Sequence, residues 1–224
     1  MSCVVVLSGG LDSLTVLAEV VAKDEEIYPF AVDYGQNNLV ELSYAKKQIS
    51  FYQAMLLGET EIHNIHISEL RNLFTEYSSI TDKAISGWNS EDIFYVPGRN
   101  LVFASMAASF AESVGANTVY MGFVGKSFSG ENTDLVPDTS EDFAESVNAI
   151  LQTTGVDVKL KAPFVEYDKG MVLEEAIALG APVRWSFSCV SPLDDVTCGK
   201  CPSCTERAAA FAVNGVLDTA PGLV

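Results

Sequence analysis

The chain has 224 residues, 48% of them hydrophobic, and its 30 acidic against 13 basic side chains give a formal net charge of −17. This composition is typical of a globular protein with a substantial core and excludes disordered, collagen-like and repeat folds. Nucleic acid is disfavoured as a partner, because phosphate backbones are held by lysine and arginine. The most apolar stretch, Leu101 to Ala111, contains two serines, so we expect a buried helix there and no membrane partner.

The N-terminus leads directly into an apolar run with no basic leader, so we expect a cytoplasmic protein. Short apolar runs alternate with longer amphipathic ones, which predicts an α/β fold with a parallel sheet flanked by helices. The predicted strands are Cys3 to Leu7, Ile27 to Val32, Glu61 to Ile67, Thr118 to Gly122 and Val158 to Lys161. The predicted helices are Leu11 to Ala22, Val40 to Leu57, Leu101 to Val114, Ser140 to Leu151, Lys169 to Leu179 and Pro202 to Ala212.

Two long polar segments, Ser78 to Tyr95 and Phe123 to Thr139, show no regular period. Loops of this length in a compact domain are usually functional, so we predict that they are substrate lids. After Pro182 the pattern changes to closely spaced cysteines and a short helix. We therefore predict a nucleotide-binding α/β domain over residues 1–182 and a metal-binding tail over residues 183–224 packed on it.

The first predicted strand runs directly into the loop Ser8-Gly9-Gly10-Leu11-Asp12-Ser13. Glycines let the backbone approach an anion, the serines offer hydroxyls, and the start of the following helix supplies free N–H groups. The loop lacks the Gly-Lys-Ser/Thr ending of a Walker A motif. A lone glycine pair would favour a tight turn capped by Ser13 or Asp12, but hydroxyls on both sides of the glycines favour a phosphate site.

This loop resembles the SGGxDS loop of the PP-loop ATP pyrophosphatases, which bind ATP and release pyrophosphate while adenylating a substrate oxygen. The resemblance implies an adenine nucleotide α-hydrolase-like fold. It also implies that the phosphates of ATP are bound by Ser8, Gly9, Gly10, Leu11, Asp12 and Ser13.

Four of the five cysteines are spaced C-x8-C-x2-C-x2-C near the end of the chain: Cys189, Cys198, Cys201 and Cys204. Four thiolates close a tetrahedral shell and leave no position for water, so the pattern predicts a structural Zn²⁺ site. Two disulfides are disfavoured in a reducing cytoplasm, and an iron–sulfur cluster is the remaining alternative. Cys3, in the first strand, is interpreted as a small buried hydrophobic residue.

Several motifs occur in one order along the chain. They are the SGGLDS loop, Asp33-Tyr34-Gly35-Gln36, Pro97-Gly98-Arg99-Asn100-Leu101 and the cysteine cluster. Together they resemble the 7-cyano-7-deazaguanine synthases from Ser8 to about Arg207. The resemblance implies ATP with Mg²⁺, one Zn²⁺ per chain and a homodimer.

The implied reaction, part of queuosine biosynthesis, uses 7-carboxy-7-deazaguanine, ATP and ammonia. Adenylation and ammonia attack give the amide, and a second ATP activates the amide oxygen so that the nitrile (preQ0) forms. A related ligase acting on another small carboxylic acid is an alternative, because fold does not fix substrate. A tRNA-thiolation enzyme is disfavoured by the negative charge, and a non-catalytic zinc module leaves the SGGLDS loop unexplained.

We expect Asp12, Arg99 and Lys169 to act in catalysis. Asp12 would position Mg²⁺, Arg99 would clamp a carboxylate or phosphate with its planar fork, and Lys169, at a helix start, indicates an anionic ligand nearby. Surface roles are the alternatives for Arg99 and Lys169. Asp33 and Gln36 follow a strand end and are either cofactor-binding or turn-forming residues.

The chain departs from the family pattern after the fourth predicted strand. Family members commonly have Asp-Tyr/Phe-Ser-Gly-Tyr-Pro-Asp-Cys, whereas residues 127–134 are Ser-Phe-Ser-Gly-Glu-Asn-Thr-Asp. The resemblance implies substrate contacts from Asn100 and from the retained Phe128, Ser129 and Gly130. The altered flanks motivate a second hypothesis, that the reaction stops at 7-amido-7-deazaguanine.

Overall fold

A computed structural model describes residues 2–23, 26–56, 60–71, 73–74, 78, 80–81, 95–126 and 137–219. Strands and helices alternate along these ranges. The elements are β1 (Ser2–Val6), α1 (Leu11–Val21), β2 (Glu26–Asp33), α2 (Glu41–Leu56), β3 (His66–Glu69), α3 (Arg99–Val114), β4 (Thr118–Tyr120), η1 (Pro137–Thr139), α4 (Glu141–Thr153), β5 (Lys159–Lys161), α5 (Lys169–Ala178), η2 (Val183–Trp185) and α6 (Pro202–Val213).

The strands form one parallel sheet in the order β3-β2-β1-β4-β5. β1 lies in the middle, and Cys3 is in register with Ile27 of β2 on one side and Thr118 of β4 on the other. The chain therefore winds outward from β1 to β3 and then returns to the opposite side of β1. Such a reversal opens a crevice at the carboxyl ends of the strands, where open α/β sheets bind ligands.

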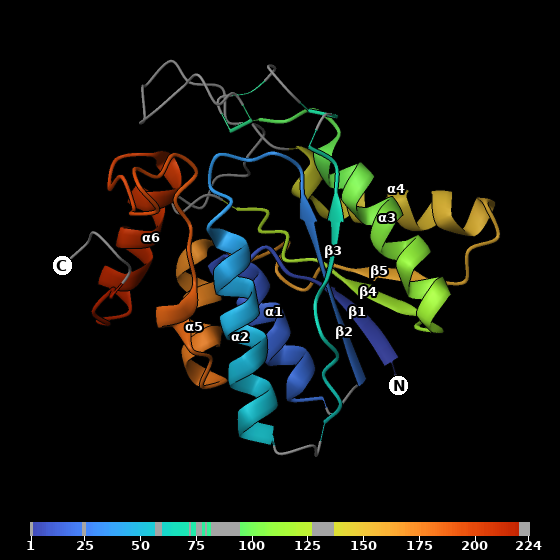
Figure 1. The fold of residues 1–224 in the computed structure, drawn as a ribbon, viewed down its shortest axis with the longest axis horizontal. Helices are drawn as coiled ribbons and strands as arrows, with labels where there is room; N and C mark the ends of the chain where they lie inside the picture. The colour runs from blue at the N-terminus through green and yellow to red at the C-terminus, as the bar shows by residue number, and fades with distance from the viewer. Residues whose placement is uncertain are drawn as a thin grey trace.

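Helices cover both faces of the sheet, with α1, α2 and α5 on one face and α3 and α4 on the other (Figure 1). Each face has its own apolar core. One core joins β1 to α1, α2, α5 and α6 and includes the fully buried Leu14, Leu17 and Leu173. The other joins β2 and β4 to α3 and α4 through small alanines such as Ala104, which let α3 approach the sheet closely.

The five strands and six α-helices expected from the sequence are confirmed. Gly115 and Gly180 follow two of the helices at positive φ. The third strand was expected at Glu61 to Ile67 but lies at His66–Glu69, preceded by a single bridge between Ile27 and Ile62. The gap between this bridge and β3 lies opposite Pro29 of β2. Pro29, like Ile27, faces the third strand, but it has no N–H to donate to that strand.

The segment after residue 182 packs against the main body, since Ala210 and Phe211 of α6 belong to the core that contains β1 and α1. The guanidinium of Arg207, on α6, is buried and donates hydrogen bonds to Ser186, Ser188 and Asp218. It thereby joins α6 to both flanking segments. Within the described part of the chain, no helix combines the length and hydropathy that a membrane span requires.

Candidate active site

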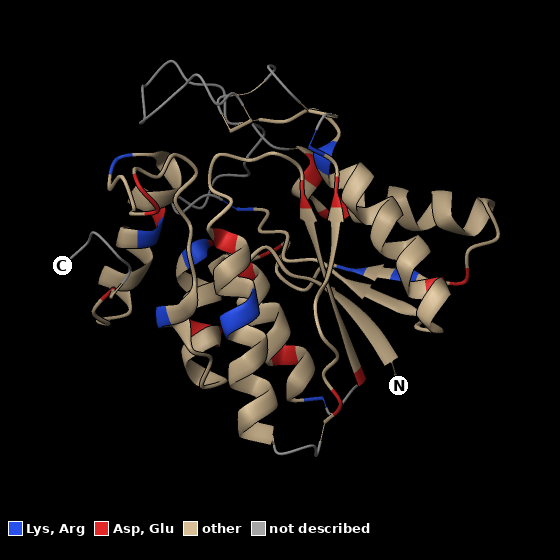
Figure 2. Ribbon diagram, in the orientation of Figure 1, with Lys and Arg blue, Asp and Glu red and all other residues tan. Residues whose placement is uncertain are grey.

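A cavity of about 310 Å³ opens at the carboxyl ends of β1, β2 and β4. Its walls are completed by the starts of α1, α2, α3 and α5 and by residues of the C-terminal segment. Charged groups gather around these strand ends, with acidic residues at the ends of β2 and β3 and basic residues at the starts of α3 and α5 (Figure 2). The cavity therefore occupies the crevice that the strand order creates.

The phosphate loop forms one end of this cavity. Gly9 has a φ of +93°, and a Cβ at this position would lie 2.0 Å from the carbonyl oxygen of Glu41, so only glycine fits. Gly10 is the N-cap of α1 and provides no side chain to cap it. The alternative in which Ser13 or Asp12 caps the helix is therefore wrong. No side chain in the described part of the chain caps the start of α1, so its first N–H groups can bind an anion.

The two serine hydroxyls of the loop hold its shape. Ser8 Oγ and Ser13 Oγ are 3.1 Å apart, and the backbone N–H of Gly10 donates to Ser8 Oγ over 3.1 Å. Ser13 Oγ also donates to the carbonyl of Gly10 and accepts from the N–H of Ser8, both at 3.2 Å. This network preorganises the loop, so an incoming phosphate meets donors that are already in position.

Lys169 and Asp12 meet at the mouth of the loop although they are 157 residues apart. The Lys169 ammonium donates to both carboxylate oxygens of Asp12, at 2.6 and 2.5 Å. Both side chains line the cavity and are only 15% and 26% exposed. Lys169 is thus a cation held at the start of α5, close to the first N–H groups of α1. A phosphate bound by those N–H groups could also accept a hydrogen bond from the Lys169 ammonium.

A second part of the cavity wall, which we call the Arg99 end, is built around Arg99. The guanidinium of Arg99 donates to Tyr34 Oη over 3.2 Å and lies 5.6 Å from the centre of the Tyr34 ring. Asn100, the next residue, donates to the backbone carbonyl of Asp138 over 3.0 Å. Arg99 carries five N–H donors, and among the described residues its guanidinium makes one hydrogen bond, to Tyr34, so it has donors to offer a carboxylate or phosphate in the cavity.

Glu41, at the start of α2, faces this Arg99 end. Burial raises the pKa of Glu41 from 4.5 to about 7, against the opposing effects of Gln36, Arg99 and Asn38. Gln36 and Asn38 donate to its two oxygens, at 3.1 and 2.8 Å. The Asn38 Oδ1 atom is buried without a partner among the described residues.

Asp33 and Gln36 do not line the cavity. The carboxylate of Asp33 is buried, pairs with Arg71 at 2.6 Å and accepts the N–H of Gly35 at 3.1 Å. Gln36 accepts the N–H of Tyr34 at 2.9 Å and donates to Glu41. Both side chains hydrogen-bond within the turn that carries Tyr34 to the cavity, as the turn-forming alternative predicts, and cofactor binding by them stays a prediction.

The third wall of the cavity comes from the C-terminal segment. The carbonyl of Gly9 accepts two hydrogen bonds, from the N–H of Phe187 at 2.9 Å and from Gln48 Nε2 at 3.0 Å. Three residues of the C-terminal segment line the cavity: Ser188, Ser203 and Glu206. Burial raises the pKa of Glu206, whose neighbouring charges are Lys169, Asp12 and Asp168.

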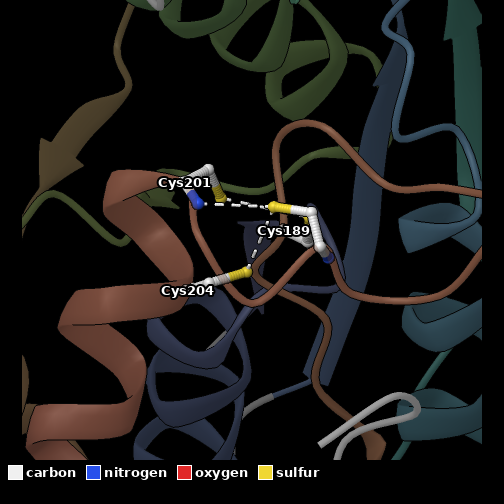
Figure 3. A group of neighbouring side chains, drawn as sticks. Cys189, Cys201 and Cys204 are labelled. Atoms are coloured by element: carbon white, nitrogen blue, oxygen red, sulfur yellow. Dashed lines mark hydrogen bonds between the residues drawn. The ribbon is translucent and has the colours of Figure 1, made fainter. Parts of the chain in front are cut away.

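The four clustered cysteines lie close together on this same segment. Their sulfur atoms are all within 4.8 Å of one another, with Cys189 to Cys201 and Cys198 to Cys204 both at 4.0 Å. Cys189 faces Cys201 and Cys204, which lie at the start of α6 (Figure 3). Four sulfurs at about 2.3 Å from one tetrahedral ion would be about 3.8 Å apart, so the arrangement fits a metal.

Backbone N–H groups also point at these sulfurs. Cys198 N–H donates to Cys189 Sγ and Cys201 N–H donates to Cys198 Sγ, both at 3.3 Å. Hydrogen bonding with Cys189 and Cys204 lowers the pKa of Cys201. Thiolates supported by backbone donors are the form that binds a metal ion. Cys3 lies apart, fully buried in β1 as expected.

Comparison with known protein families gives a match to the family described as "Queuosine biosynthesis protein QueC" over residues 2–215. The chain belongs to this family. A 7-cyano-7-deazaguanine synthase from Acetivibrio thermocellus is 32% identical over 218 residues, covering 96% of this chain and 95% of that protein. The synthase of the same name from Magnetococcus marinus is 34% identical over 228 residues, covering 99% and 96%.

Among solved structures, the chain resembles a 4-thiouridine synthetase crystallised with RNA and bound ATP. The TM-score is 0.51 at 16% identity, over 94% of this chain, and the chain spans about half (53%) of that protein. This likeness shows that the QueC-family chain has the PP-loop, adenine nucleotide α-hydrolase-like fold.

Several predicted residues fall outside the described part of this QueC-family chain. Phe128, Ser129 and Gly130 are among them, as are most of both predicted lids. Local sequence patterns do not single out Asn38, Glu41 or Glu206, which line the cavity, or Asp138 beside Asn100 and Arg99. A signal for Asp138 was present in the sequence. Pro137 and Asp138 form a Pro-Asp pair like the one in the family pattern, just beyond the altered residues 127–134.

Proposed function

We propose that this chain is an ATP-dependent ligase that converts 7-carboxy-7-deazaguanine and ammonia to 7-cyano-7-deazaguanine. The observation that carries the proposal is the meeting, in one cavity, of the phosphate loop at the start of α1 and the Lys169–Asp12 pair. A loop of this kind binds the phosphates of ATP, and the family supplies the class of substrate.

A carboxylate is a poor electrophile until one of its oxygens becomes a leaving group. In the proposed reaction ATP adenylates that oxygen, ammonia displaces AMP to give the amide, and a second ATP activates the amide oxygen for loss as AMP. The first N–H groups of α1 and the Lys169 ammonium would stabilise the negative charge that develops on the departing pyrophosphate. Each group is fixed before the nucleotide arrives, so little reorganisation is required.

The Arg99 end would hold the deazapurine carboxylic acid. Its guanidinium presents donors to the cavity and is surrounded by Tyr34, Asn100 and Glu41. A planar guanidinium can bind a carboxylate through two parallel hydrogen bonds and so orient one oxygen toward the α-phosphate. This placement would bring the two reactants together in one cavity.

Two metals complete the proposal. Mg²⁺ would arrive with ATP, neutralise phosphate charge and be held by Asp12, since carboxylate oxygens are its preferred ligands. Zn²⁺ would be held by the four cysteines and would fix the C-terminal wall of the cavity. The homodimer and the cytoplasmic location remain predictions of the family resemblance and of the sequence.

Mass spectrometry of a reaction mixture tests the proposal. Protein loaded with zinc is incubated with 7-carboxy-7-deazaguanine, ATP, Mg²⁺ and ammonium, and acid, amide and nitrile are followed over time. We expect the nitrile, with two AMP formed for each, and no turnover with the Asp12→Ala variant. Amide alone would support the truncated reaction, and no conversion would redirect the search to other small carboxylic acids.

Zinc is tested separately with the Cys201→Ser variant. Losing one of four ligands should abolish stoichiometric zinc, measured by atomic emission, and lower the melting temperature by several degrees, because metal binding contributes directly to folding. Cys3→Ser is the matched control, since Cys3 is equally buried but lies apart from the cluster. A Cys201 variant that keeps one zinc per chain would contradict the assignment.

A further inference from the structure

Helix α6 serves two sites at once. Two residues of the cysteine cluster lie at its start, Cys201 as the N-cap and Cys204 in the first turn. Ser203 lies between them and Glu206 just after them, and both line the cavity. Glu206 follows Ser203 by three positions, so the two side chains project from one face of the helix. Whatever fixes the start of α6 therefore also fixes Glu206 in the wall of the cavity.

Glu206 differs from the other carboxylates around the phosphate loop. Asp12 is paired with Lys169, and Asp168 caps α5 by accepting the N–H of Met171 at 2.9 Å. Glu206 makes no hydrogen bond and no ion pair with any residue in the described ranges, although it is partly buried. A desolvated carboxylate left without a partner in a binding cavity calls for a cation from outside the chain.

The charges around the loop point to the kind of cation. Glu206 lies near enough to Lys169, Asp12 and Asp168 to be affected by their charges. The Lys169 ammonium is already engaged by Asp12. A nucleotide polyphosphate would bring several further negative charges to the same end of the cavity. Carboxylate and phosphate oxygens together are the ligands of a hard divalent cation such as Mg²⁺.

We propose that Glu206 is a second carboxylate which, with Asp12, holds the divalent cation of the bound nucleotide. The proposal rests on the proposed ATP-dependent function and adds a residue from the cysteine-bearing helix to the nucleotide site. Asp12 reaches the cation from the phosphate loop and Glu206 from α6, so the cation bridges the two parts of the chain. Magnesium-dependent nucleotide binding is then coupled to the position of the cysteine cluster.

The variant Glu206→Gln tests this idea, because it keeps the size of the side chain and removes its charge. Glu174→Gln is the matched control, since Glu174 is exposed on α5 and does not line the cavity. Binding of Mn²⁺ is measured by electron paramagnetic resonance in the presence of the α,β-methylene analogue of ATP, which cannot be cleaved at that bond. Zinc content and melting temperature are recorded for each protein.

We expect Glu206→Gln to weaken Mn²⁺ binding by about tenfold or more, the scale on which loss of a metal-supporting group acts, while Glu174→Gln leaves it unchanged. Without added divalent cation, the variant should bind the analogue at least as tightly as the parent, since a repelling charge is gone. A merely structural Glu206 would instead weaken binding with and without the cation.

Unchanged Mn²⁺ affinity in a Glu206→Gln protein that retains its zinc would overturn the inference. Failure of the proposed function looks different, because the parent protein would then bind neither the analogue nor Mn²⁺ with it. Glu206→Asp distinguishes the charge of the side chain from its packing. If this variant recovers part of the Mn²⁺ affinity that Glu206→Gln loses, a ligand role is supported. If it recovers no affinity, a ligand role is contradicted.

Discussion

The two ends of the cavity are built in different ways. The phosphate end is a contiguous loop whose binding groups are backbone N–H groups, held by Gly9 and by hydroxyls within the same six residues. The Arg99 end is a cluster of side chains from the turn after β2, the start of α2 and the start of α3. The binding groups of the first end are positioned by backbone geometry. Those of the second end are positioned by a network of buried polar side chains.

This difference predicts how each end responds to change. A backbone site tolerates no added atom where the chain is closely packed, so substitutions there should act as all-or-none changes in folding. A network of side chains can lose one member while the others keep their positions. Substitutions there should therefore produce graded changes in ligand affinity and in the pH dependence of stability. The variants below test that contrast, starting with the largest expected effect.

Gly9→Ala should destabilise the protein by at least about 4 kcal/mol, because its Cβ would overlap the Glu41 carbonyl at a left-handed φ. Gly98→Ala is the control: Gly98 also has positive φ, but nothing lies within 4 Å of its Cβ, so about 1 kcal/mol is expected. Urea denaturation of both variants checks this. Equal losses would show that conformation, rather than close packing, makes Gly9 necessary.

Glu41→Gln should change how stability depends on pH. Because the pKa of Glu41 is raised to about 7 in the folded state, its contribution is full below about pH 4.5 and is lost as pH rises through 7. The loss amounts to about 3 kcal/mol at 1.36 kcal/mol per pKa unit. The parent should therefore lose stability relative to the variant between about pH 5 and 8, as measured by denaturation at each pH.

Exposed Glu145→Gln supplies the control for this experiment, and it should leave the pH dependence of unfolding as it is in the parent. Parallel curves for the parent and Glu41→Gln would mean that the pKa of Glu41 is the same in the folded and unfolded states. Glu41 would then be ionised in the folded protein between about pH 5 and 8.

Arg99→Met should weaken binding of 7-carboxy-7-deazaguanine by about 2 kcal/mol, or roughly 30-fold, the size of a hydrogen-bonded charge contact. The affinity for ATP should change much less, because the phosphates bind at the other end. Isothermal titration calorimetry with each ligand measures both. Arg184→Met, which removes an exposed guanidinium stacked on Trp185, should alter neither affinity. If Arg99→Met lowers the affinities for both ligands equally, the nucleotide contacts the Arg99 end as well as the phosphate loop.

Ser140→Ala should have the smallest effect, about 1 kcal/mol, because Ser140 caps α4 by accepting the N–H of Phe143 at 3.1 Å. The cap anchors η1, from which Asp138 and Thr139 reach the Arg99 end. Thermal unfolding measures the change, and Ser140→Asp should retain most of the stability. A Ser140→Ala protein that melts with the parent would show that η1 is anchored elsewhere.

The same contrast explains what could be predicted from the sequence. The order of elements follows from local patterns, since alternating apolar and amphipathic runs fix strands and helices residue by residue. The loop at Ser8 to Ser13 and the cysteine cluster are contiguous, so their chemistry can be recognised without knowing the fold. Pro29 could have indicated the displaced third strand, but only once the partner strand was known.

The Arg99 end depends on the strand order, which local patterns do not contain. Asn38 and Glu41 look like ordinary helix-start residues until the reversal at β1 brings them to the cavity. Glu206 sits between cysteine ligands and an arginine, so nothing local connects it with Asp12. Asp33 and Gln36 show the opposite case, in which residues of a motif support the site from behind rather than contact the cavity.

The carbonyl of Gly9 accepts hydrogen bonds from both Gln48 and Phe187, and Gln48 also donates to the carbonyl of Trp185 at 2.7 Å. One peptide group therefore joins the nucleotide-binding turn, the second helix and the cysteine-bearing segment. Opening of any one segment removes partners from the other two, so their amides should exchange with solvent together, as one cooperative unit.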